Sequence, residues 1–308
     1  MAKIFSIIVS YNGAPWIEKC LHHLFKSDVQ TEVIIIDNAS TDNTLKLLEP
    51  YKDSIYLIKN KVNTGFGQAN NLGIEYAMDN GADFIFLLNQ DAYVFVDTIS
   101  KLTESLVNNP SFGLLSPLQL EVSGKEIEPI FKNFLSKNFS KDIIEKMLSN
   151  GNSFPTDKPY SMRFVNAAAW MITRKCIIKT GLFHPVFFHY GEDNHYASRV
   201  QYHGMKIGVL PVAHVIHDCK IEIADSQSLL LRKIKNIPIY TLLDLRKPLP
   251  IAYLLGYQKW RSLRKKLLKF NTANNQNIIN EQKKWFTTNL SKAIQIRNET
   301  KNPTTKWK

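Results

Sequence analysis

Polar side chains follow hydrophobic runs at several points of this 308-residue chain, as they do where strands end at a binding crevice. Asp37 closes the apolar run of VIIIDNASTDNT (33–44), and Asn89 and Asp91 close that of LLNQDA (87–92). A strand-end carboxylate can accept a hydrogen bond from a nucleobase NH or a ribose hydroxyl. Alternate residues of an extended segment share one side, so Asn89 and Asp91 can reach one hydrated divalent cation. Each motif alone also fits a plain turn or helix cap.

A glycine-rich and amide-rich segment, NTGFGQANNLG (63–73), is typical of a turn that enters a helix. Gly65 allows the backbone to approach a ligand closely, and a helix start favours anionic groups. It is not a dinucleotide fingerprint, because Asn70 stands where the third glycine is required, and the chain has no phosphate-binding P-loop motif. An ordinary turn before a helix is the alternative.

Two further motifs lie in the second half of the chain. FFHYGEDN (187–194) places Glu192 and Asp193 at an expected helix start, where free NH groups keep a carboxylate ionised; this suits a general base and equally an N-cap. PVAHVIHD (211–218) offers His217 as an imidazole ligand, although a lone histidine is more often structural.

The elements that must position these residues are apolar strands alternating with amphipathic helices. Strands are expected at 4–10, 33–36, 54–59 and 84–88, and helices from Pro15, from a cap at Ser40 or Thr41 to about Glu49, and at 68–80. This alternation predicts an α/β fold with a parallel sheet covered on both faces. The polar clusters at residues 11–12, 37–38, 60–63 and 89–91 should therefore converge on one crevice.

The pattern loosens after Pro110. A strand is expected at 112–119, and residues 120–159 look irregular except for a short helix near 142–148, which suggests acceptor-facing structure or a mobile loop. Order is expected to return at 162–164, followed by helices at 174–180 and 192–203 and a strand at 207–210.

Composition indicates a globular protein, with 44% hydrophobic residues and only 13 Gly and 13 Pro. Three distant cysteines favour neither a disulfide framework nor a zinc site, and no signal peptide or spanning segment is expected, so we expect a reducing, cytoplasmic location.

The charge is divided along the chain. Residues 1–219 carry 20 basic and 22 acidic side chains, whereas residues 220–308 carry 19 and 5. Segments 229–240 and 251–270 mix apolar and basic residues at helical spacing, which fits either peripheral attachment to the inner face of the cytoplasmic membrane or a helical pair packed on the first domain.

Taken together and in this order, the motifs resemble the family-2 glycosyltransferases of the GT-A fold, in particular their bacterial rhamnosyltransferase-like branch. The resemblance covers about residues 4–217 and rests on SIIVSYN, VIIIDNASTDNT, NTGFGQANNLG, FLLNQDA, FFHYGED with Arg199 and Gly204, and His217. It implies a Rossmann-like, mixed but mainly parallel sheet in a catalytic domain of residues 1–219. Its nucleotide-binding half would be 1–110 and its acceptor-binding half 111–219, with a basic, mainly helical extension at 220–308.

The resemblance also implies roles. Asp193 would be the catalytic base with Glu192 beside it, and Arg199 would contact either the acids or a diphosphate. Asp91 and His217 would bind Mg²⁺ or Mn²⁺. The nucleotide would be held by Ser10, Tyr11, Asp37, Asn63, Gly65, Asn71 and Asn89. The implied reaction is inverting transfer from a UDP- or dTDP-sugar, dTDP-rhamnose included, to a saccharide or lipid-linked saccharide in cell-surface polysaccharide synthesis.

Three residues depart from the family pattern. Asn89 stands where the family usually has the first acid of the D-x-D motif, Gln90 stands where this branch often has proline, and His195 stands where it often has another acid. The competing interpretations are a non-catalytic carbohydrate-binding or scaffold protein on a decayed transferase fold, and a sugar-phosphate nucleotidyltransferase, whose glycine-rich signature is missing after the first strand. A nucleic-acid partner is suggested only by the basic tail, and we expect none.

Overall fold

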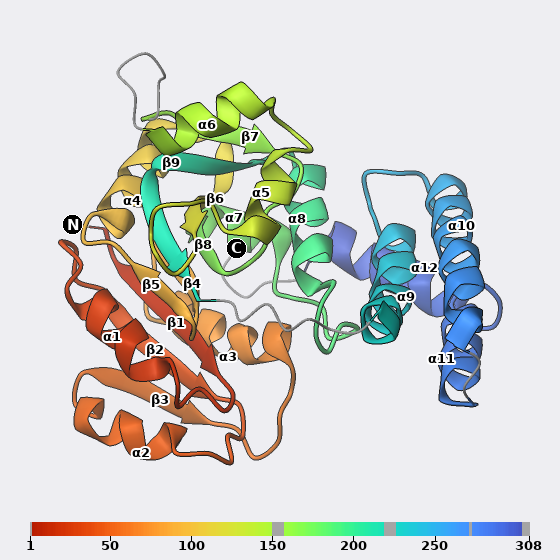
Figure 1. The fold of residues 1–308 in the computed structure, drawn as a ribbon, viewed down its shortest axis with the longest axis horizontal. Helices are drawn as coiled ribbons and strands as arrows, with labels where there is room; N and C mark the ends of the chain where they lie inside the picture. Colours follow the sequence, from red (N-terminus) through yellow and green to blue (C-terminus); the bar gives the residue numbers. More distant parts are fainter. Residues whose placement is uncertain (1, 150–156, 219–225, 271–272, 304–308) are drawn as a thin grey trace.

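The computed structural model describes residues 2–149, 157–218, 226–270 and 273–303 (Figure 1). The strands are β1 (Ile4–Ser10), β2 (Glu32–Asp37), β3 (Ile55–Lys59), β4 (Phe84–Asn89), β5 (Ala92–Val94), β6 (Phe112–Leu120), β7 (Tyr160–Met162), β8 (Ala169–Thr173) and β9 (Lys206–His217). The helices are α1 (Ile17–Phe25), α2 (Thr44–Leu48), α3 (Phe66–Asp79), α4 (Thr98–Asn108), α5 (Pro129–Leu135), α6 (Lys141–Ser149), α7 (Arg174–Thr180), α8 (Glu192–Tyr202), α9 (Ser226–Leu242), α10 (Leu249–Leu267), α11 (Ala273–Lys284) and α12 (Leu290–Lys301).

One sheet with the order β3-β2-β1-β4-β8-β6-β9-β5 runs through the first part of the chain, and β7 pairs with β9. Strands β3, β2, β1 and β4 are parallel, whereas β8 is antiparallel to β4 and β6. The predicted α/β fold with a mixed, mainly parallel sheet is confirmed.

The strands are apolar throughout because both faces of the sheet are covered. In β1, Phe5 and Ile7 face one hydrophobic core with α3, α7 and α8, while Ile4 and Ile8 face a second core with α1 and α4. Successive side chains of an extended strand point to opposite faces of the sheet, so an apolar strand such as β1 contributes to both cores.

Two boundary predictions are wrong. The helix after β2 begins at Thr44, not at Ser40 or Thr41, because the Ser40 hydroxyl accepts from the Asn12 NH and the Thr41 NH donates to the Asn12 side chain. The last strand runs on to His217 rather than ending at Leu210. A register shift opposite Pro117 absorbs the break in its pairing with β6, so a proline is tolerated at 211.

Strands β5 and β8 and helices α4 and α5 were not predicted. β5 has only three residues, and β8 pairs with β4, which lies far earlier in the chain, so no local pattern marks it as a strand. Helix α5 begins at Pro129, and the Glu128 side chain caps it by accepting from the NH groups of Ile130 and Phe131.

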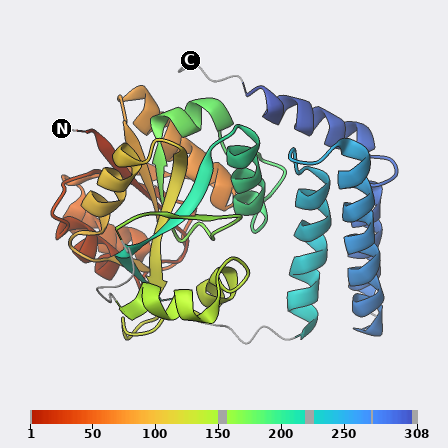
Figure 2. The same ribbon diagram turned by 90° about the horizontal axis from the view of Figure 1, so that it is seen from above.

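The extension consists of helices α9 to α12, which enclose a hydrophobic core of their own (Figures 1 and 2). Helix α12 runs back toward the part of the chain that holds the sheet, where the His203 ring lies 3.4 Å from the Thr300 carbonyl oxygen. The packed alternative for the basic tail is therefore observed, with more helices than the expected pair. The predicted boundary at 219/220 lies outside the described residues, and none of the described helices has the length and apolarity needed to cross a membrane.

Candidate functional site

Three strands bring their polar ends to one edge of the sheet. In the register of the sheet, Ser10 at the end of β1 lies opposite Asp37 of β2, and Val9 lies opposite Asn89 of β4. The strand order reverses between β2-β1 and β1-β4, which is where open parallel sheets bind ligands. The convergence expected from the sequence is found for these strands.

Hydrogen bonds of side chains hold the loops at this edge together. Asn38 is buried and donates to the Asn63 carboxamide (2.9 Å), while its own oxygen accepts from Asn60 (2.9 Å) and from the Thr64 NH (3.0 Å). Ala39 next to it has φ +66°, a conformation that costs a non-glycine residue energy and is typical of functional loops. The Asn63 oxygen is thus already used to shape the crevice.

Gln90 is a site residue that the sequence marked only as a departure from the family pattern. Its carboxamide oxygen accepts from the Ser10 hydroxyl (2.8 Å) and the Tyr11 NH (3.0 Å), and its nitrogen donates to the Tyr11 carbonyl. Ser10 and the Tyr11 backbone are therefore held by Gln90, while the Tyr11 ring is 46% exposed and free to stack on a ligand.

Asp37 is buried at the centre of this edge. One carboxylate oxygen accepts from the Ser40 NH (3.3 Å), and the other has no hydrogen-bond partner among the described residues. A buried carboxylate oxygen without a partner is costly unless a ligand supplies one.

The glycine-rich segment is positioned by the loop before α8. A Cβ on Gly65, which has φ +83°, would lie 1.9 Å from the Phe188 carbonyl oxygen. Asn71 uses both amide atoms on the main chain of Phe183, at 2.8 and 2.9 Å. The structure therefore places Gly65 and Asn71 as contacts between α3 and the 183–190 loop, and both polar atoms of the Asn71 side chain already bond to that loop.

Asp91 and His217 meet at the junction of β5 and β9, with 3.6 Å between the Asp91 Oδ1 and the His217 Nε2 atoms. The Asn89 Oδ1 and the His217 Nδ1 atoms are buried and lack partners in the described part of the chain. Burial raises the pKa of Asp91, and the imidazole of His217 opposes that shift.

These residues fit a divalent cation that is completed by substrate oxygens. Mg²⁺ is usually held by one or two carboxylates together with substrate phosphates and water, so Asp91 with His217 is a sufficient protein contribution. Among the described residues no group of three or more His, Cys, Asp or Glu side chains forms a closed metal site. Asp218, which accepts from the Tyr93 hydroxyl (3.0 Å), is a further acid here that the sequence analysis missed; its only signal was its position directly after His217.

Glu192 and Asp193 begin α8 and differ in environment. Glu192 is 5% exposed and its Oε2 atom has no partner among the described residues, whereas Asp193 is half-buried and accepts from the NH and the side chain of Asn194 (2.7 and 3.0 Å). Burial, with the charge of Asp193 second, raises the pKa of Glu192 to about 8. Burial also raises the pKa of Asp193, although the hydrogen bonds from Asn194 act to lower it. At neutral pH the pair therefore holds a proton on Glu192.

This proton predicts the pH dependence of stability. Because the pKa of Glu192 is about 8 when folded and near 4.5 when exposed, the folded state binds more protons between these values, and stability falls as pH rises through that window. Glu192→Gln should remove this loss and raise the melting temperature at pH 8.5 by about 3 °C or more relative to wild type. Thermal melts from pH 5 to 9 measure it, with Glu104→Gln on the exposed face of α4 as the matched control. Parallel melting curves of wild type and Glu192→Gln across this range would contradict it.

Arg199 and His195 lie elsewhere than expected. The Arg199 guanidinium is buried and donates to the Thr180 and Leu182 carbonyls (3.1 and 2.6 Å), so it is neither a partner of the acids nor a diphosphate contact. His195 is buried against Phe187, and burial lowers its pKa well below the usual range, so the ring is neutral and does not face an acceptor.

Phe187 ties the acidic motif to the extension. It is a buried member of the hydrophobic core formed by α9 to α12, and the Asn236 side chain of α9 reaches the His189 carbonyl. The loop that leads to Glu192 and Asp193 is thus anchored by residues more than 40 positions later in the chain.

Comparisons with known proteins agree with this geometry. Residues 6–151 match the family described as Glycosyl transferase family 2. The dTDP-rhamnosyl transferase RfbF of Shigella flexneri is 23% identical over 245 residues, 78% of this chain and 75% of that protein. The poly(ribitol-phosphate) beta-N-acetylglucosaminyltransferase TarS of Staphylococcus aureus is 29% identical over 105 residues, which are 32% of this chain but only 18% of that protein.

A similar fold is found in the mannosyltransferase PcManGT of Pyrobaculum calidifontis, solved with GDP-Man and Mn²⁺. The TM-score is 0.59 at 14% identity, over 97% of this chain and 86% of that one. At this identity the likeness concerns the fold, and the fold is that of the GT-A proteins.

Proposed function

We propose that this chain, which matches glycosyl transferase family 2 over residues 6–151, is a glycosyltransferase that uses a UDP- or dTDP-sugar and inverts the anomeric centre. The observation that carries the proposal is the unpartnered Asp37 oxygen at the same sheet edge as the Asp91–His217 pair. A nucleobase NH or a ribose hydroxyl would donate a hydrogen bond to the unpartnered Asp37 oxygen. The Asp91–His217 pair would hold the metal ion that binds the diphosphate. The relative RfbF, a dTDP-rhamnosyl transferase, supports a dTDP-linked donor, dTDP-rhamnose included, and TarS, which has been solved in complex with UDP, supports a UDP-linked one.

The donor half of the site would be held as follows. Asp37 accepts a hydrogen bond from the nucleoside, Tyr11 stacks on it, and Ser10 with Gln90 keeps the Tyr11 backbone in place. Asp91 and His217, with Asn89 nearby, would hold Mg²⁺ or Mn²⁺. When bound, that ion neutralises the charge that develops on the departing diphosphate.

Asp193 would act on the acceptor. Its carboxylate takes the proton of the acceptor hydroxyl while the hydroxyl oxygen bonds to the anomeric carbon and the bond from that carbon to the diphosphate breaks. Burial raises the pKa of the neighbouring Glu192 to about 8, so near neutral pH Glu192 does not add a second negative charge beside Asp193. A single displacement inverts the anomeric centre, and no covalent sugar–enzyme intermediate forms.

The acceptor in this proposal is a hydroxyl of a saccharide or lipid-linked saccharide in cell-surface polysaccharide synthesis. Attachment to the inner face of the cytoplasmic membrane stays a prediction, favoured by the excess of basic residues in 220–308 and by exposed Ile251 and Leu254 on α10.

A thermal-shift screen of nucleoside diphosphates and nucleotide sugars, with and without Mn²⁺ or Mg²⁺, tests the donor assignment. A ligand that binds only the folded state at 100 times its Kd stabilises it by about 2.7 kcal/mol. We expect metal-dependent stabilisation by UDP or dTDP compounds and slow hydrolysis of the matching nucleotide sugar. Stabilisation by none of them would favour a non-catalytic protein on this fold.

A further inference from the structure

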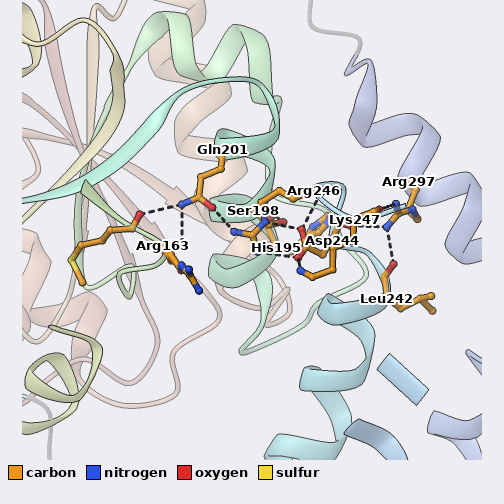
Figure 3. Close-up of polar contacts among 10 residues, drawn as sticks. Arg163, His195, Ser198, Gln201, Leu242, Asp244, Arg246, Lys247 and Arg297 are labelled. Atoms are coloured by element: carbon orange, nitrogen blue, oxygen red, sulfur yellow. Dashed lines mark hydrogen bonds and ion pairs between the residues drawn. The ribbon is translucent and has the colours of Figure 1, made fainter. Parts of the chain in front are cut away.

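A second polar pocket lies where α8 meets the turn between α9 and α10. It has a volume of about 180 Å³, and its lining includes Arg163, Asn194, Ser198, Tyr240, Arg246 and Lys247. Figure 3 shows Ser198, Asp244, Arg246 and Lys247 close together at this junction, with Arg163 to one side next to Gln201. At about 30 Å³ per water molecule, the space suits a group of the size of a phosphate with its hydration.

The charge of the lining is positive. The lining holds three basic residues, Arg163, Arg246 and Lys247, and one acid, Asp244. Arg246 engages Asp244 with both its Nε (2.8 Å) and NH2 (3.0 Å) atoms, and Lys247 also contacts it. Burial alone would raise the pKa of Asp244, but the hydrogen bonds from Arg246 and Lys247 lower it, so Asp244 is ionised. The lining therefore carries three basic side chains and one carboxylate.

Arg163 is the cation with no assigned structural task. Its main chain is held on both sides, because its NH donates to Asn138 (3.3 Å) and its carbonyl accepts from Gln201 (3.0 Å). Its guanidinium is exposed and has no hydrogen-bond or ion-pair partner among the described residues. A fixed backbone with a free guanidinium is an arrangement that suits bidentate binding of phosphate.

The pocket adjoins the proposed base. Asn194, which lines it, donates to the Asp193 carboxylate (3.0 Å). Tyr240, on the opposite wall, lies close enough for the charge of Asp193 to add to the effect of burial in raising the pKa of its phenol to about 12. A group bound in the pocket is therefore one residue away from the carboxylate that would deprotonate the acceptor.

We propose that this pocket is an acceptor subsite that binds a phosphoryl group of the acceptor, with Arg163 as its principal ligand and Lys247 and Arg246 supplying further positive charge. The inference rests on the proposed function for the identity of the acceptor, but the binding of phosphate does not depend on sugar transfer. A saccharide phosphate and the diphosphate of a lipid carrier share this chemistry.

The test uses inorganic phosphate as the probe, titrated into the full chain with EDTA present and followed by ³¹P NMR. Arg163→Gln should weaken phosphate binding by about tenfold, since charge-assisted hydrogen bonds carry that order of energy, and Arg163→Glu should abolish it. Arg261→Gln, the same charge change on the exposed face of α10, should leave the affinity unchanged. Phosphate affinity that is equal in wild type and Arg163→Gln, or lowered as much by Arg261→Gln, would overturn the proposal.

Two further probes separate the sources of the phosphate. Methyl phosphate and geranyl diphosphate are compared in wild type and Arg163→Gln: stronger, Arg163-dependent binding of the diphosphate indicates a lipid-linked acceptor, and equal binding indicates a saccharide phosphate. The thermal shift by nucleotides should be unchanged in Arg163→Gln. A chain that binds phosphate through Arg163 but hydrolyses no nucleotide sugar would refute the proposed transfer while leaving this subsite standing.

Discussion

Asp193→Asn is expected to lower turnover by about 10²- to 10⁴-fold, the range that positioned general bases contribute. The amide keeps the shape of the side chain and its contact with Asn194 but cannot take a proton. Donor affinity, measured as the metal-dependent thermal shift by the nucleotide found in the screen, should change little, because Asp193 lies at α8 and not at the edge formed by β1, β2 and β4. Steady-state rates at saturating donor give the loss of kcat.

The neighbouring acid provides the control. Glu192 is protonated at pH 7, so Glu192→Gln keeps the charge that the wild-type side chain has there and should retain turnover within about threefold, a difference below 1 kcal/mol. Both substitutions exchange one acid for its amide at the start of the same helix. Normal turnover in Asp193→Asn, or an equal loss in Glu192→Gln, would remove Asp193 from the role of base.

Asp91→Ala is expected to abolish most of the metal dependence of nucleotide binding. Asp91 is the only carboxylate paired with His217 among the described residues, and a cation held by two protein ligands loses most of its anchorage when its only anionic one is removed. We expect the Kd for the nucleoside diphosphate in the presence of Mn²⁺ to rise by about tenfold or more, equivalent to ~1.4 kcal/mol. Calorimetric titrations with Mn²⁺ and with EDTA measure it.

Asp218→Asn is the matched control for Asp91→Ala, since Asp218 lies in the same cluster and bonds to the Tyr93 hydroxyl. Asp218→Asn should retain most of the difference in nucleotide Kd between the titration with Mn²⁺ and the titration with EDTA. If nucleotide affinity is the same with and without metal in wild type and in Asp91→Ala, the metal assignment fails, and Asp91 then serves only to hold His217.

The first four strands and their polar ends followed from the sequence for a local reason. Residues 4–10 and 33–36 are short, uninterrupted apolar runs between amphipathic helices, a pattern with few folded solutions other than a parallel sheet covered on both sides. Once the sheet is parallel, Ser10, Asp37 and Asn89 must share one edge, because the carboxyl ends of parallel strands do.

The remaining features depend on partners distant in the chain, which no local pattern encodes. Asn71 and Arg199 look like ligand contacts in sequence, but the Asn71 amide and the two terminal nitrogens of Arg199 bond to the main chain of residues 180–183. Gln90 became a site residue only because the end of β1 lies beside it.

In the acidic motif too, some features follow from the local sequence and others depend on partners distant in the chain. Its residue types and its place at a helix start were readable from FFHYGEDN, although Gly191, and neither acid, is the N-cap and no side chain caps the helix. The pKa of Glu192 depends on its burial and on the charge of Asp193. The anchoring of Phe187 in the core of α9 to α12 and the cationic pocket beside Asn194 arise only when the extension packs on α8. Burial and electrostatic fields are sums over neighbours in space, so they are decided by the tertiary structure.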